Sequence, residues 1–158
     1  MDTPLVITGL GLTTSLGIGV EANWTALRAG ETGLRPLTSI DVADHPVTDG
    51  GEAPLIPGAN PNDDRRDRAH AYLTAAIREA LTSAGIDGRV PDPERTSLLL
   101  GSSLAAQASA PVFWASFLEK GPRDADFSAL RSYDAETRLA SLCADLDVRG
   151  EAFLVSNA

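Results

Sequence analysis

The chain has 158 residues, of which 43% are hydrophobic and 22% charged, a composition typical of a folded globular protein. Lys and Arg number 13 against 22 Asp and Glu, and the net charge of −9 disfavours nucleic acid and anionic membrane as partners. No apolar run approaches the roughly 20 residues that cross a bilayer, so we expect no membrane-spanning segment.

The N-terminal part is expected to begin with a buried strand. Residues 5–8 (Leu-Val-Ile-Thr) form a short β-branched run that ends at Gly9. The residues before it include an acid and no basic segment, which does not fit a signal peptide. Residues 21–29 predict a short helix that stops at Gly30. Residues 31–66 are rich in Gly, Pro and Asp and predict a long irregular excursion.

The clearest helical pattern covers residues 67–84. Asp67 is its expected N-cap, and Gly85 is the residue expected to end it. The apolar face of this helix is mostly alanine, and small side chains allow backbones to approach closely. We therefore expect it to pack flat against a sheet or another helix.

The second half of the chain alternates strands with helices. Apolar runs predict strands at 97–100 and 152–156, and the continuous apolarity of the first predicts burial on both faces. Between them we expect helices at 107–119 and at 134–146, the latter with Asp134 as N-cap. This alternation indicates the α/β class.

The sequence ends two residues after the expected strand 152–156. In α/β proteins a helix and a functional loop usually follow such a strand. Two interpretations remain equally open from the residues alone. The strand is either an ordinary C-terminal edge strand or the point at which a longer fold is cut.

One glycine pattern suggests a nucleotide site. Residues 17–22 (Gly-Ile-Gly-Val-Glu-Ala) match G-x-G-x-x-A, and Asp41 follows about twenty residues on. However, Gly17 does not follow the expected strand end at Gly9 in a tight turn. Pro36 also interrupts the stretch where a second strand is needed. A small nucleotide-binding α/β domain is thus an alternative that the context disfavours.

Candidate nucleophiles and metal ligands are few. Cys143 is the only cysteine, which excludes an internal disulfide framework and a Cys-rich zinc site and fits a cytoplasmic protein. It falls within the apolar repeat of an expected helix, where cysteine behaves as a small hydrophobe. The only histidines, His45 and His70, have no partner at metal-ligand spacing. We therefore expect structural roles for all three, and no metal site.

Several segments share an order and a spacing that are informative together. They are residues 6–11, 15–17, 23–34, 67–68, 75–81, 84–86, 99–103 and 148–158. In this order they resemble the opening of a β-ketoacyl-acyl carrier protein synthase. Each segment alone is weak evidence for the family. Together, however, the segments match it in the same order over essentially the whole chain.

The resemblance implies an incomplete thiolase-like α/β fold. Residues 1–158 would be the N-terminal domain of such a synthase and would form most of the N-terminal half of its fold. The family condenses acyl and malonyl thioesters with decarboxylation, in fatty acid or polyketide biosynthesis, and needs no cofactor. Its nucleophilic cysteine directly follows the residue that matches Ala158, and its two catalytic histidines lie further on. We therefore expect this chain alone to be inactive, with no catalytic residue of its own.

The resemblance also implies two candidate sites. Arg65, Arg66 and Arg68 form the densest basic cluster, and in the family basic residues here help to dock the acidic acyl carrier protein. Only Arg65 falls on a position that matches one of them, and a solvated helix start is the alternative. Leu104 is expected to wall the acyl pocket. Residues 105–106 are Ala-Ala where the family often has Gly-Gly, which leaves the detail of that pocket open.

Association is the remaining expectation. In the family the strand that matches 152–156 lies along the two-fold axis of a dimer, so we expect a homodimer or a pair with a partner synthase. A rival hypothesis is a truncated, non-catalytic paralogue that serves as partner or scaffold for an intact synthase.

Overall fold

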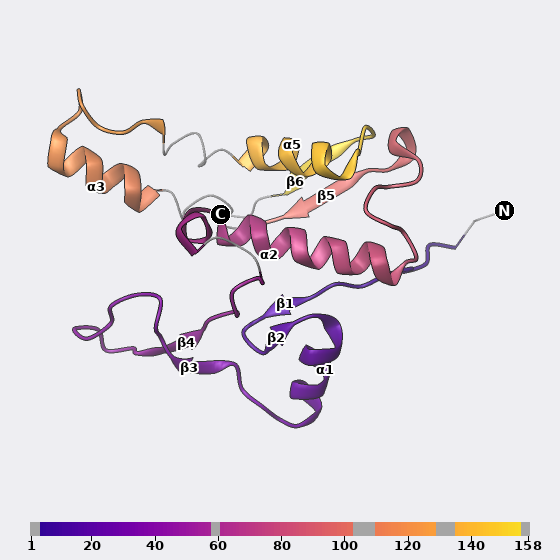
Figure 1. Cartoon of the computed structure of the whole chain (residues 1–158), viewed down its shortest axis with the longest axis horizontal. Coiled ribbons are helices and arrows are strands. Elements are labelled where there is room, and N and C mark those ends of the chain that lie inside the picture. Colours follow the sequence, from indigo (N-terminus) through magenta and orange to yellow (C-terminus); the bar gives the residue numbers. More distant parts are fainter. Residues whose placement is uncertain (1–3, 58–60, 103–109, 129–134, 156–158) are drawn as a thin grey trace. The chain divides into compact units, whose positions relative to one another are not determined.

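A computed structural model of the chain describes residues 4–57, 61–102, 110–128 and 135–155 (Figure 1). The chain forms two compact units. Unit 1 comprises Met1–Ala59 and Ala71–Gly85, and unit 2 comprises Asn60–His70 and Ile86–Ala158. No helix in the described ranges is both long and apolar enough to cross a bilayer.

Unit 1 opens on a tight antiparallel pair that leads directly into a helix. Strands β1 (Thr13–Thr14) and β2 (Gly17–Ile18) pair, and α1 (Val20–Arg28) follows. Asn23 of α1 is 1% exposed and donates from Nδ2 to the carbonyl oxygens of Gly17 (2.9 Å) and Gly19 (2.7 Å). Its Oδ1 accepts a hydrogen bond from the Thr14 hydroxyl. One buried amide thus fixes the turn against the helix.

The expected helix at 21–29 is confirmed to within a residue. Gly30 has a φ of 71°, and its amide donates to the carbonyl oxygen of Leu27 (3.1 Å). Glycine adopts this left-handed conformation without a steric penalty, which is why it ends the helix.

The region 31–66 is more regular than expected. Strands β3 (Leu34–Pro36) and β4 (Asp49–Gly51) form an antiparallel pair within it. Gly33 lies against Ser15, where a Cβ atom would come within 2.1 Å of the Ser15 Oγ. The expectation of a long irregular excursion is therefore wrong where β3 and β4 pair, and this pair packs on the β1–β2 turn.

Helix α2 (Pro61–Ser83) begins at Pro61 and not at Asp67, so the expected N-cap is wrong. Proline is favoured at the first helical position, because its missing amide hydrogen has no partner in the helix there. At the other end, Gly85 has a φ of 75° and ends the helix as predicted.

The alanine face of α2 does permit close packing, as expected. A Cβ atom on Gly9 would lie 2.0 Å from the Ala80 carbonyl oxygen, and one on Gly11 would lie 1.8 Å from that of Ala76. The residues that approach the helix, however, form no strand. Residues 5–8 belong to no strand or helix in the structure, and Leu5 is fully exposed. The predicted strand is therefore wrong, since a strand needs a hydrogen-bonded neighbour.

Unit 2 contains the parallel pair that defines the fold class. Strands β5 (Leu98–Gly101) and β6 (Ala152–Val155) pair in parallel, with helices α3 (Ala110–Lys120) and α5 (Ala135–Leu146) between them in sequence. The predicted strands and helices are confirmed, although Asp134 lies outside the described residues. Parallel strands joined through helices confirm the α/β class.

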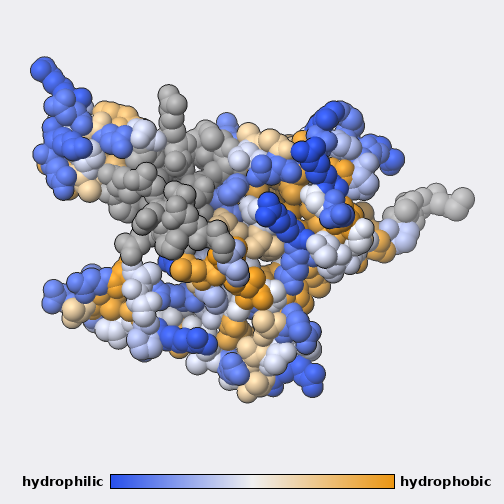
Figure 2. All heavy atoms as spheres, viewed as in Figure 1, coloured by the Kyte–Doolittle hydropathy of each residue, from blue (hydrophilic) through white to orange (hydrophobic). Residues whose placement is uncertain are grey.

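One face of the pair is covered by α5. The helix packs against β6, and three of its leucines at helical spacing are buried: Leu139, Leu142 and Leu146. On the strands, Leu99 is 71% exposed and its register partner Phe153 is 52% exposed. The prediction of burial on both faces is therefore wrong for the described residues. Figure 2 shows apolar residues at the surface in orange.

Helix α3 carries a small aromatic cluster. The Phe113 ring is buried and lies 5.4 Å from the Phe127 ring and 5.3 Å from the Trp114 ring, centre to centre. The Asp126 amide donates to the Ser116 hydroxyl over 2.8 Å. These contacts hold the segment after α3 against the helix.

Candidate functional site

The carboxyl ends of β5 and β6 meet at one point. Gly101 and Val155 are register partners, and the Ser102 amide donates to the Val155 carbonyl oxygen over 3.0 Å. In α/β proteins chemistry gathers where the carboxyl ends of parallel strands lie side by side. In sequence, Leu104 follows β5 and residues 156–158 follow β6, and both lie outside the described residues.

The opposite end of the pair is held by a single carbonyl group. Before β5, residues Pro93–Arg95 form the 3-10 helix η1. The Pro93 carbonyl oxygen accepts hydrogen bonds from the amides of Arg149 (2.9 Å) and Gly150 (3.0 Å). The next bond of the ladder runs from the Leu98 amide to the Glu151 carbonyl oxygen over 3.0 Å. Strand β6 is therefore anchored before its first residue.

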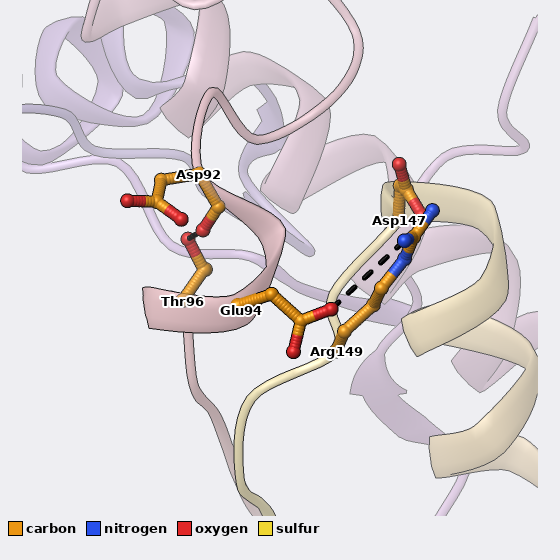
Figure 3. Close-up of polar contacts among 5 residues, drawn as sticks. All are labelled: Asp92, Glu94, Thr96, Asp147 and Arg149. Carbon is orange, nitrogen blue, oxygen red and sulfur yellow. Dashed lines mark hydrogen bonds and ion pairs between the residues drawn. The ribbon is translucent and has the colours of Figure 1, made fainter.

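The turn from α5 into β6 has a fixed conformation. Asp147 has a φ of 57°, and the Val148 amide donates to the Cys143 carbonyl oxygen over 2.8 Å, which closes the helix end. The Arg149 Nε lies 3.0 Å from the Asp147 Oδ1, and its Nη1 lies 3.9 Å from the Glu94 Oε1 (Figure 3). Because the Arg149 and Glu94 side chains are largely exposed and Asp147 is only half-buried, the ion pairs orient the turn more than they stabilise it.

Cys143 lies inside α5, and its side chain is half-buried. It is not at a helix N-terminus, the position that stabilises a nucleophilic thiolate. This placement supports the structural role that the sequence predicts.

The two histidines lie in different segments of the chain. His45 is exposed in the segment between β3 and β4, and His70 is half-buried within α2. Within the part of the chain that the structure describes, no three His, Cys, Asp or Glu side chains come together as a possible metal site.

The glycine pattern at 17–22 does lead into a helix N-terminus, but a carboxylate already occupies that position. Glu79 of α2 accepts hydrogen bonds from the amides of Val20 (2.7 Å, to Oε1) and Leu12 (2.9 Å, to Oε2). A phosphate group would need the same donors. In addition, β1 and β2 are antiparallel and do not form a βαβ unit. The nucleotide-binding alternative is therefore not supported.

Sequence reasoning missed Glu79 entirely. It lies 59 residues from Val20, and nothing in the local pattern of α2 marks it as the cap of another helix. Asp41, the acidic residue about twenty positions after the glycine pattern, accepts a hydrogen bond from the Ala43 amide over 3.1 Å in an exposed loop.

The arginine cluster lies within α2 and not at its start, because the helix begins at Pro61. The side chains of Arg65 and Arg66 lie outside the described residues. Arg68 is half-buried and interacts within the chain. The docking role of these residues stays a prediction.

Known proteins share both the sequence and the fold. Residues 2–158 match the family model described as beta-ketoacyl synthase, N-terminal domain. A granaticin polyketide putative beta-ketoacyl synthase 1 of Streptomyces violaceoruber is 34% identical over 113 residues, which cover 69% of this chain and 27% of that protein.

Solved structures agree with this relationship. The ishigamide ketosynthase/chain length factor superposes with a TM-score of 0.78 at 28% identity, over 96% of this chain and 39% of that one. A type II polyketide acyl carrier protein in complex with its ketosynthase gives a TM-score of 0.71 at 15% identity, over 95% of this chain and 37% of that one.

The chain thus spans between about a quarter and two fifths of the length of these relatives, 27% to 39%. Its fold is part of the thiolase-like fold of the ketosynthases. The chain belongs to the β-ketoacyl synthase family and corresponds to the N-terminal domain of that family.

Proposed function

We propose that this sequence forms the N-terminal part of a synthase that condenses an acyl thioester with malonyl thioester in polyketide or fatty acid biosynthesis. One observation carries this proposal. The Ser102–Val155 hydrogen bond places the end of β6, which resembles the approach to the family nucleophile, beside the end of β5. We place the synthase in the cytoplasm, which the single cysteine supports.

The proposed reaction divides between this sequence and the residues that follow in the relatives. A cysteine directly after the position of Ala158 takes the acyl group from its thioester and releases the thiol. Malonyl thioester then loses carbon dioxide, and the resulting carbanion attacks the acyl carbon and displaces the cysteine thiolate. In this scheme β6 leads to the segment that carries the cysteine, and β5 leads to the segment that contains Leu104. Leu104 contributes to the wall around the acyl chain.

We also propose that Arg65, Arg66 and Arg68 help to dock an acyl carrier protein. Carrier proteins are acidic, and complementary charge speeds their encounter with a basic surface. The cluster is the densest one in a chain of net charge −9. One of the structural relatives is a ketosynthase in complex with its carrier protein, which supports this class of partner.

For association, we propose that β6 pairs two synthase subunits, as a homodimer or with a partner synthase. In the described part of the chain β6 is bonded to β5 on one edge only, and a free strand edge can accept another strand. The ketosynthase/chain length factor among the relatives supports pairing between proteins of this fold.

A condensation assay tests the proposed function. The full-length gene product would be incubated with an acyl thioester and malonyl thioester, and carbon dioxide and the β-ketoacyl thioester would be measured. We expect both products in equal amounts. Decarboxylation without a carbon–carbon bond, or no turnover of either substrate, would contradict the proposal.

A further inference from the structure

We propose that Gly150 is a positioning residue for the site at the carboxyl ends of β5 and β6. This inference rests on the proposed function, because it concerns how the segment before the nucleophile is placed. It goes beyond that function by assigning the placement to a residue at the opposite end of the strand.

The contact at Gly150 requires the absence of a side chain. A Cβ atom there would lie 2.3 Å from the Thr96 carbonyl oxygen and 3.2 Å from that of Glu94. Both are backbone atoms, so they cannot swing aside as the end of a flexible side chain could. Gly150 does not adopt a positive φ, so the close approach is the reason for glycine at this position.

The backbone that faces Gly150 is itself held in place. The Thr96 hydroxyl donates to the Asp92 carbonyl oxygen over 2.7 Å, and the Thr96 amide donates to that of Pro93 over 3.4 Å. The Pro93 oxygen in turn accepts the Gly150 amide over 3.0 Å. The two strands are therefore locked together, by contact and by hydrogen bonds, just before the first pair of the ladder, Leu98 and Ala152.

A methyl group at Gly150 would push the start of β6 away from η1. Strand β6 runs only from Ala152 to Val155, so a displacement at its start passes along the strand to the Ser102–Val155 bond. Val155 precedes the expected nucleophile closely in sequence, so a shift of Val155 is transmitted through the backbone toward that position. A misplacement of about 1 Å at a reacting group can lower a rate by about 100-fold.

Hydrogen exchange at the Ser102 amide tests the mechanical part of this proposal without any assay of activity. In the full-length gene product, Gly150→Ala is expected to speed exchange of that amide on the order of tenfold. The matched control is Gly121→Ala, which is strained by a φ of 79° but has no atom within 4 Å of the new Cβ. It should leave Ser102 unchanged. Equal exchange at Ser102 in both variants would overturn the proposal.

A milder variant covers the case in which Gly150→Ala does not fold. Thr96→Val keeps the shape of the side chain but removes the bond that holds η1. Like Gly150→Ala, it should loosen the contact between η1 and the start of β6, and it should speed exchange of the Ser102 amide by about threefold. Unchanged protection of the Ser102 amide in this variant would count against the proposal that contacts at η1 hold β6 in place.

The rate at which an acyl thioester acylates the synthase tests the effect of Gly150 on the reaction. Per folded molecule, Gly150→Ala should lower the maximal acylation rate by about tenfold to 100-fold with little change in half-saturation, while Gly121→Ala keeps the wild-type rate. If both variants lose activity only in proportion to their unfolded fraction, Gly150 is purely structural and the proposal fails. If the wild type itself is not acylated, the proposed function fails, and the exchange data still decide the role of Gly150.

Discussion

The Ser102 amide donates a 3.0 Å hydrogen bond to the carbonyl oxygen of Val155. The bond is the last described rung between two parallel strands that lie 54 positions apart in register, as in the pair Gly101 and Val155. Because it joins the carboxyl ends of the two strands, it fixes the register of β6 against β5 at that end of the pair. A segment that continues past Val155 therefore starts from a position that this register sets.

The arginine cluster predicts a salt-dependent effect on carrier recognition. Replacing Arg65 and Arg66 with Glu in the full-length synthase should slow acyl transfer from a carrier protein on the order of tenfold at low salt. The effect should shrink as salt rises, because the attraction is screened. Transfer from a small thioester, which needs no docking surface, is the control. Equal slowing with both donors would show that the arginines act on folding instead.

Glu79 predicts a stability effect that is centred on α1. Glu79→Ala removes the acceptor for the Val20 and Leu12 amides and should lower the free energy of unfolding by about 1–2 kcal/mol. Glu79→Gln should cost less, because its amide oxygen can still accept one of the bonds. Arg78→Ala, at the exposed neighbouring position, is the control. Urea denaturation gives all three values, and equal stability of the Glu79 and Arg78 variants would contradict the capping role.

Glu52 predicts a pH dependence at the base of the hairpin. Hydrogen bonds from the Ser39 hydroxyl, the Thr38 and Ser39 amides and the Thr38 hydroxyl lower its pKa from 4.5 to about 2. Because the pKa is lowered, the ionised Glu52 carboxylate contributes to the stability of the folded state above pH 4.5. This contribution to stability is lost as the pH falls toward 2. The Thr38 and Ser39 amide signals should therefore titrate in that window by NMR. The change should vanish in Glu52→Gln, and an unchanged titration in that variant would assign it to another group.

The exposed apolar face predicts association. Leu99, Phe153 and Val155 are each more than half exposed on the β5–β6 pair, and exposed strand edges and apolar patches promote pairing. We expect the purified 158-residue chain to be oligomeric or poorly soluble despite its net charge of −9. Sedimentation velocity measures this directly. A compact monomer at micromolar concentration would argue against it.

Local patterns predicted the elements whose causes are local. The spacing of Leu139, Leu142 and Leu146 marks the buried face of α5, and Gly30 and Gly85 end their helices with the positive φ that glycine favours. The start of α2 could also have been predicted from the sequence, because Pro61 followed by acidic residues is a common helix opening.

Features that depend on distant partners could not be predicted. The run at 5–8 has the composition of a strand, but composition does not supply the neighbouring strand that a ladder requires. The cap of α1 comes from Glu79, and the need for glycine at position 150 comes from the Thr96 carbonyl group. Each is a contact between segments far apart in sequence, so no local pattern marks it.

Location of the acyl group on the protein is the most direct test of the central claim. After incubation with an acyl thioester, peptide mass spectrometry of the full-length gene product should find one acyl group on a cysteine directly after the position of Ala158. The isolated 158-residue chain should carry none. A stoichiometric adduct on Cys143 that disappears in Cys143→Ser would contradict the account.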